Sequence, residues 1–357
     1  PCSAARVSPM DTPTRTGTRP GSPVRWRKPL LAFGLSLYLV GSIAAIFTSD
    51  FASLLAMRAV QGAGAAALQV VTMALVRDCF SGQSMGRVLT FVFTTFMIVP
   101  IIAPSIGQAI ELAGGWTGIF VFNAVAGGML LVWMWLRLRE TLDHGERRSL
   151  SLGSLWQALV EIVTNRVTFG YAVAGTLTLI SLFAYVVSVQ QVYGELYGLG
   201  TLFPLAFGAS AIGVALSALY SARVVRRFGM RPVAHGAMVI FASSGMILFL
   251  LSLAGQPPFW LTFALLSICM ASFGVLQGNI NAIALEPLGH IAGIASSVCG
   301  VVTTSIGTVL GGVVGQAYNG TVTPLAFAFG FGGLLALLAV FWTERGTASR
   351  LVLAVRP

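Results

Sequence analysis

Residues 51–76 read FASLLAMRAVQGAGAAALQVVTMALV, an apolar stretch long enough to cross a lipid bilayer as a helix. Arg58 is its one charged residue. A guanidinium keeps its charge inside a protein, and placing it in hydrocarbon costs from about 3 to more than 10 kcal/mol. A chain that keeps such a residue usually points it at a polar pathway, so membrane transport is the first hypothesis. The structural alternative is an Arg58 that extends to the membrane surface or bonds to backbone carbonyls.

The composition of the whole chain places it in a membrane. Only 9% of residues are charged and 56% are hydrophobic, and the mean hydropathy is +0.86. A soluble domain carries about 25% charged residues. The four cysteines show no paired spacing, so neither a disulfide nor a metal site is expected, and the absence of a phosphate loop or a nucleophile elbow argues against an enzyme. About ten apolar segments have the length of a span, near 30–48, 51–76, 88–112, 116–136, 167–189, 201–222, 233–254, 258–283, 291–314 and 323–343.

The basic residues fix an expected orientation. Every Lys and Arg except Arg58 falls in one alternating set of loops and in the two terminal stretches. Because positively charged loops stay in the cytoplasm, both termini are expected inside. The same asymmetry explains the net charge of +10 without any nucleic-acid partner.

The chain also resembles itself at an offset of about 205 residues, as in transporters built from two parallel repeats. Gly107-Gln108-Ala109 recurs as Gly315-Gln316-Ala317. The first four spans therefore correspond to the last four, and the fifth and sixth spans lack partners. We expect a twelve-span architecture without its first two helices, and a true ten-span family is the alternative. The expected parts are a polar, disordered, non-family stretch at 1–26, an N-terminal bundle of four spans at 27–136 (equivalent to helices 3–6), a cytoplasmic linker at 137–166, a C-terminal bundle of six spans at 167–343 (helices 7–12), and a cytoplasmic tail at 344–357.

Two motifs resemble a known family. The run Arg58–Ala66 looks like the R-x-x-Q-G-x-G-A-A motif of the major facilitator superfamily, and Ala284–Gly293 resembles a loop of its Bcr/CflA-type drug:proton antiporters. The antiporter motif survives only as Ala103–Gln108, and the second copy of the loop motif keeps Arg226, Gly229 and Arg231 but has no aspartate. The chain is thus similar to an N-terminally truncated member of this group.

The resemblance implies an all-α major facilitator fold of two helix bundles, with about ten of twelve helices present. It implies a secondary active transporter that exports small amphipathic drugs or metabolites in exchange for protons by alternating access. It further implies no cofactor beyond the proton gradient, a monomer in the lipid bilayer of the bacterial inner membrane, and weak transport by this truncated chain. The alternatives are a ten-span drug/metabolite-type transporter and a non-transporting, receptor-like membrane protein.

Candidate pathway residues follow from spacing and from the resemblance. Arg58, Gln61, Gly62 and Gln69 share one helix face. Glu111 is the best local candidate for a proton-carrying carboxylate, and its alternative is a solvated interfacial group. Asn279 and Asn281 are amides at membrane depth, expected either to line the pathway or to bond helix to helix. The histidines are expected at the surface. Conformational roles are expected for a set of motif residues: Pro104, Gly107, Arg226, Gly229, Arg231, Glu286, Pro287 and Gly289.

Overall fold

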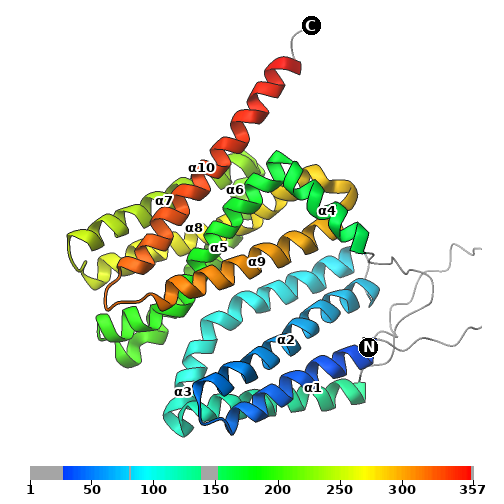
Figure 1. Ribbon diagram of the computed structural model, residues 1–357, viewed down its shortest axis with the longest axis vertical. Coiled ribbons are helices and arrows are strands. Elements are labelled where there is room, and N and C mark those ends of the chain that lie inside the picture. Colours follow the sequence, from blue (N-terminus) through cyan, green and yellow to red (C-terminus); the bar gives the residue numbers. More distant parts are fainter. Residues whose placement is uncertain (1–26, 80–81, 138–151, 355–357) are drawn as a thin grey trace, which may run out of the picture. The chain divides into compact units, whose positions relative to one another are not determined.

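A computed structural model describes residues 27–79, 82–137 and 152–354. Throughout these ranges the regular structure is helical, which confirms the expected all-α fold. The chain divides into two compact units (Figure 1). One comprises Pro1–Phe96 with Ser105–Arg148, and the other comprises Met97–Pro104 with Ser149–Pro357. The expected disordered stretch at 1–26 lies outside the described residues, as does much of the expected linker.

The first unit contains α1 (Arg27–Ile46), α2 (Phe51–Cys79) and most of α3 (Gly82–Arg137). Helices α1 and α2 cross closely because two glycines remove side chains from the contact. A Cβ on Gly64 would lie 2.5 Å from the Tyr38 nitrogen, and one on Gly41 would lie 2.7 Å from the Gln61 nitrogen. Asp50 caps the start of α2, since its Oδ2 accepts a hydrogen bond from the Ser53 backbone N–H at 2.8 Å.

Helix α3 holds two of the expected spans, 88–112 and 116–136. Its helical geometry breaks at Gly115, whose φ of 70° and ψ of −178° suit only glycine. The chain reverses there, and the second half of α3 runs back beside α1 (Figure 1). Contacts confirm this neighbourhood, because Lys28 donates from Nζ to the Trp135 carbonyl at 3.2 Å. Nine helices of the described residues are long and apolar enough to span a membrane when α3 is taken as one.

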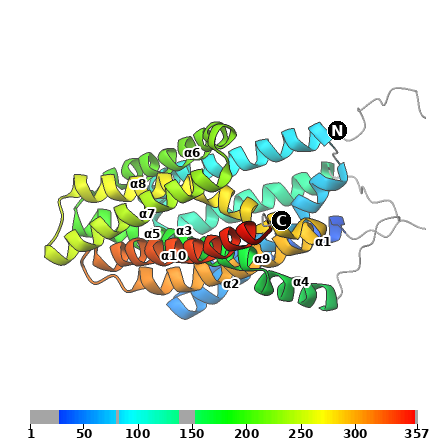
Figure 2. The ribbon, with the colours of Figure 1, turned by 90° about the horizontal axis from the view of Figure 1, so that it is seen from above.

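The second unit contains six long helices: α5 (Arg166–Gln191), α6 (Phe203–Phe228), α7 (Met230–Ala254), α8 (Phe259–Leu285), α9 (Ala292–Gln316) and α10 (Thr323–Ala354). Short turns of helix at η1 (Val192–Leu196), η2 (Gly200–Leu202) and η3 (Glu286–Ile291) join some of them. Figures 1 and 2 show α5, α7, α8 and α10 side by side, and they bury the main core around Tyr171, Phe241, Leu266 and Phe329. Helix α10 continues past the expected end of its span at 343 and into the expected tail.

Glycines also set the closest contacts of this unit. On α9, a Cβ on Gly311 would lie 2.6 Å from the Ile180 carbonyl oxygen, and one on Gly315 would lie 2.6 Å from the Val187 Cβ. The G-x-x-x-G spacing therefore lets α9 pack directly on α5.

The expected linker at 137–166 contains a helix that charge patterning did not predict. Helix α4 (Leu152–Thr164) buries Ala158 and Ile162 and exposes Trp156 and Val163. Ile162 packs with Leu288 and Ala295 in a small cluster of its own. Apolar residues at helical spacing are the physical reason, because they give this segment one face that can be buried.

Candidate functional site

Arg58 belongs to a chain of hydrogen bonds in the first unit. Its Nη1 donates to Gln61 Oε1 at 3.0 Å, and Gln61 Nε2 donates to Ser42 Oγ on α1 at 2.8 Å. The Arg58 guanidinium also lies over the Phe120 ring, 5.5 Å from its centre. Gln61 is only 5% exposed, so it depends on these partners. Among the described residues Gln61 is the one hydrogen-bond acceptor of Arg58, and a guanidinium has five N–H donors. Arg58 is thus held in place with donors to spare.

A cavity of about 630 Å³ lies beside this chain, between α1, α2 and the second half of α3. Gly62 and Gln69 line it, together with Ala65 and Thr72 from the same face of α2. Tyr38 and Gly127 contribute from the neighbouring helices. Pockets of small-molecule ligands span about 300–1,000 Å³, so the size suits such a ligand. Of the four residues expected on one face of α2, Gly62 and Gln69 therefore line the cavity, whereas Arg58 and Gln61 are not among its lining residues.

The expected residues of α3 are not brought to Arg58 by any described contact. Glu111 is exposed, near the Gly115 reversal. Pro104 and Gly107 are partly buried in the first half of α3, whose helix continues through both positions.

The two asparagines of α8 do different things. Asn279 is 8% exposed, and its Nδ2 donates to Ser221 Oγ on α6 at 3.0 Å and to the Val275 carbonyl at 2.7 Å. Asn281 is exposed and borders a small cavity that Tyr171 and Thr303 also line. Asn279 thus forms a hydrogen bond between two helices, α8 and α6.

The motif residues of the second unit gather at the basic ends of the helices. Gly229 alone separates α6 from α7, with a φ of 85° and a ψ of 162° that favour glycine. Arg231 Nη2 then donates to Glu286 Oε2 at 3.2 Å, and its Nε lies 3.8 Å from Glu344 Oε1. Residues far apart in the sequence thus share one ion-pair network. Arg226, Pro287 and Gly289 are exposed.

His235 extends this network and corrects an expectation. It was expected at the surface, but its Nε2 lies 2.9 Å from the Tyr171 hydroxyl, which donates to Glu344 Oε1 at 2.7 Å. Tyr171 has one proton to give, so His235 Nε2 must be the donor to the tyrosine oxygen. His290 is exposed as expected and lies 3.1 Å from Glu161 of α4, and His144 lies outside the described residues.

Sequence patterns missed Ser42, Phe120, Tyr171 and Glu344 as partners of the singled-out residues. Ser42 is a small polar residue within an apolar run, which is a weak signal because such residues are common in membrane helices. The other three are brought in by tertiary packing, which leaves no periodic trace.

Comparison with known proteins decides the family. The sequence profile of the Major Facilitator Superfamily matches residues 20–312. The chain belongs to the Major Facilitator Superfamily. As a member of that superfamily it is a membrane transporter and not an enzyme, and neither the drug/metabolite-type nor the receptor-like alternative is favoured.

Curated relatives within this superfamily include drug-resistance proteins. The chain is 28% identical to the "Bicyclomycin resistance protein homolog" of Haemophilus influenzae, a match that covers 91% of this chain and 82% of the relative. It is 26% identical to the "Multidrug resistance protein MdtL" of Shewanella sp. strain ANA-3, with coverages of 87% and 78%. The resemblance to Bcr/CflA-type antiporters is therefore confirmed.

Solved structures of other superfamily transporters share the fold. The nucleoside transporter NupG matches with a TM-score of 0.64 at 15% identity, over 90% of this chain and 83% of that one. A bacterial homolog of the lysosomal transporter Spinster matches with a TM-score of 0.61 at 13% identity, over 90% and 81%. Identities this low support the shared architecture alone.

Proposed function

We propose that this transporter exports small amphipathic, drug-like compounds in exchange for protons. The observation that carries the proposal is the Arg58–Gln61–Ser42 chain beside a cavity of about 630 Å³. A fixed positive charge that stands next to a ligand-sized cavity, with donors left over from its described contacts, can bind an anionic group or lower the pKa of a nearby carboxylate. Relatives named for bicyclomycin and multidrug resistance supply the substrate class.

In this proposal Gly62 and Gln69 form the cavity wall, because both border it. Asn281 is offered as a pathway residue of the second unit, whereas Asn279 holds α8 to α6. Glu111 stays the candidate proton carrier on its sequence position alone. The network of Arg231, Glu286 and Glu344, together with the Gly229 turn, would control the conformational change, and Pro104, Gly107, Arg226, Pro287 and Gly289 are assigned to the same role.

The cellular setting is also part of the proposal. The chain would lie in the bacterial inner membrane with both termini in the cytoplasm, as its basic loops favour. It would work as a monomer, with the proton gradient as its energy source and no bound cofactor. Residues 27–136 and 167–343 would be its two bundles, with 1–26, 137–166 and 344–357 as the N-terminal stretch, linker and tail.

Transport in inverted membrane vesicles tests the proposal. A fluorescent amphipathic dye that carries an anionic group should accumulate when a proton gradient is imposed, and Arg58→Ala should reduce both this uptake and equilibrium binding of the dye to the purified protein at least tenfold. Arg58→Lys keeps the charge but loses the guanidinium geometry, so it should retain an intermediate activity. The matched control is Arg137→Ala, which removes an exposed basic residue at the end of α3. Unchanged uptake in Arg58→Ala would remove Arg58 from the mechanism, and uptake that ignores the proton gradient would refute proton coupling.

A further inference from the structure

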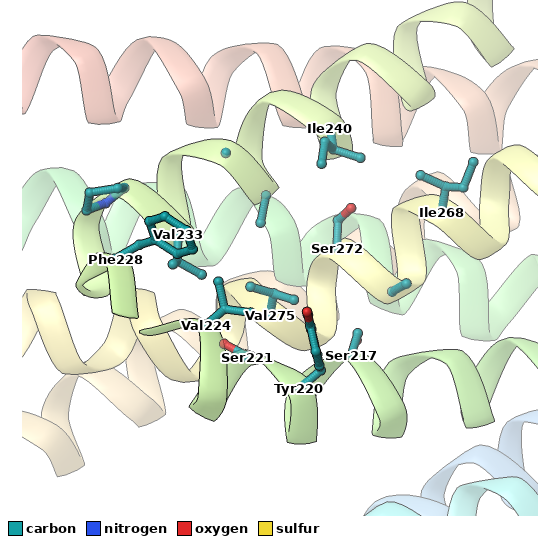
Figure 3. A pocket seen from close by; sticks show the side chains of 14 residues that line it. Ser217, Tyr220, Ser221, Val224, Phe228, Val233, Ile240, Ile268, Ser272 and Val275 are labelled. Carbon is teal, nitrogen blue, oxygen red and sulfur yellow. The ribbon is translucent and has the colours of Figure 1, made fainter. Parts of the chain in front are cut away.

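An apolar groove of about 600 Å³ runs between α6, α7 and α8 of the second unit. Figure 3 shows its walls: Val224 and Phe228 from α6, Val233 and Ile240 from α7, and Ile268 and Val275 from α8. All three helices have the length and hydropathy of membrane spans. The groove therefore lies along the membrane-spanning part of the protein.

The groove exists because small residues leave space on its walls. Gly236 of α7 borders it, and a Cβ added there would meet nothing within 4 Å. Two hydroxyl groups on the groove walls already form hydrogen bonds within the protein. Ser217 Oγ donates to the Val214 carbonyl at 2.8 Å, and Ser221 Oγ accepts from Asn279 at 3.0 Å. The interior of the groove thus favours an apolar occupant over a polar one.

A positive charge stands at one end of this apolar surface. The Arg227 guanidinium lies 5.3 Å from the centre of the Phe228 ring, which lines the groove. Arg223 precedes it by one helical turn, and both arginines are exposed. At 100° per residue, Arg227 falls beside the stripe of groove-lining residues on α6, whereas Arg226 falls on the far side of the helix. Among the described residues, no carboxylate pairs with Arg227.

We propose that this groove binds an anionic phospholipid. One acyl chain would lie between α6, α7 and α8, and the headgroup phosphate would meet the Arg227 guanidinium. A basic site between helices at the membrane surface is suited to an anionic headgroup, and arginine matches phosphate oxygens with paired donors. The charge bias of the loops places this end at the cytoplasmic leaflet. The site is separate from the Arg58 cavity, and it does not depend on the proposed transport activity.

The headgroup contact can be tested by native mass spectrometry of the purified protein. Binding of phosphatidylglycerol is compared with that of phosphatidylcholine carrying the same chains. A basic residue near an anionic surface contributes about fivefold in affinity, so Arg227→Gln should weaken phosphatidylglycerol binding by about that factor. Phosphatidylcholine binding should fall less, because the choline cation offsets the charge of its phosphate. Arg226→Gln removes the same charge from the same turn on the far side of α6, so its effect should be smaller. Equal losses in both variants would indicate general attraction to the protein and would overturn the site.

The acyl-chain contact needs a second pair of variants. Gly236→Leu puts a side chain into the groove, and it should reduce binding of both lipids several-fold. Gly300→Leu is the control, because Gly300 is also an exposed helical glycine with nothing within 4 Å of a built Cβ, but α9 does not line the groove. Thermal melts of both variants would check that they fold. Full lipid binding by a folded Gly236→Leu protein would show that the chain lies elsewhere and would refute the proposal. Displacement of the bound lipid by the transported dye would also refute the proposal, because it would make the groove a substrate site.

Discussion

The two units of the transporter place their polar side chains differently. In the first, Arg58 lies within α2, roughly 10 Å from the start of the helix at 1.5 Å per residue. Its guanidinium has one described acceptor, Gln61, and Gly62, one helical turn further along α2, lines a cavity. In the second, Arg231 lies close to both Glu286 and Glu344, and all three residues stand near the ends of membrane spans.

The two positions differ in what a charge contributes to the stability of the fold. A charge at the end of a span is partly hydrated and gains from its ion pairs, so it can be kept for stability alone. A charge within a span costs free energy, and the described contacts of Arg58 leave some of its donors without an acceptor, so they offset only part of that cost. Residues that weaken a structure locally are often those that serve function. The comparison therefore supports the proposal that Arg58 serves transport and Arg231 belongs to the conformational framework.

Leucine substitutions at neighbouring glycines should give the largest effects. Gly64→Leu would force a side chain against the backbone of Tyr38, so we expect a loss of more than about 3 kcal/mol and little folded protein. Gly62→Leu meets nothing within 4 Å and should fold, but it narrows the Arg58 cavity and should reduce transport at least fivefold. Size-exclusion profiles and vesicle uptake measure the two outcomes. Normal uptake by Gly62→Leu would separate the cavity from the transport pathway.

A pair of neighbouring glycines on α9 allows the same leucine test in the second unit, but here the variant that folds should also transport normally. Gly311→Leu should prevent folding, because its side chain would meet the α5 backbone, whereas Gly312→Leu has open space. Gly312 borders none of the described cavities, so its leucine variant should both fold and transport normally. Impaired transport by a folded Gly312→Leu protein would show that the functional surface extends to this face of α9.

The turn glycines should be of intermediate importance and similar in both units. Gly115 reverses α3 and Gly229 joins α6 to α7, each with a positive φ and an extended ψ. Alanine at either position should cost about 1–3 kcal/mol of stability, because only glycine adopts this conformation without strain. Chemical unfolding of the detergent-solubilised variants measures the loss. Gly128→Ala is the control, since Gly128 lies within α3 and a Cβ there meets nothing within 4 Å. A loss below that of the control would contradict the conformational argument.

Substituting the arginines should separate stability from transport. Arg231→Gln breaks two partly exposed ion pairs and should lower the free energy of unfolding by about 1 kcal/mol. Arg58→Gln removes a charge from an apolar helix, so it should leave the stability unchanged or raise it while transport falls. Thermal melts of both variants with and without 1 M salt provide the measurement, and the Arg231 effect should shrink in salt. A large loss of stability in Arg58→Gln would make this residue structural.

Much of the architecture could be predicted because membrane spans leave a strong apolar signal. The break between residues 112 and 116 was expected from that signal, and the reversal occurs at Gly115. The Arg58 motif likewise pointed to the cavity region. Helix α4 was missed because its surroundings are polar, so the segment was interpreted by charge and not by its periodicity. His235 was misassigned because its partners Tyr171 and Glu344 lie far away in the sequence, and only packing brings them together.

The smallest effect should come from Asp50, which caps the helix that carries Arg58. The hydrogen bond from the Ser53 backbone N–H lowers the pKa of Asp50 below its ordinary value. The carboxylate is therefore favoured in the folded state, and its contribution is present above the unfolded pKa of about 3.9 and is lost as the pH falls through the lower folded value. Acidification from pH 5 to pH 3 should thus slightly lower the melting temperature. Asp50→Asn keeps a side-chain acceptor at the cap but cannot titrate, so this part of the pH dependence should disappear while the cap survives. An identical pH profile in the variant would mean that the Asp50 cap does not contribute to the stability of the first unit, and that the position of α2 depends on its close contact with α1 instead.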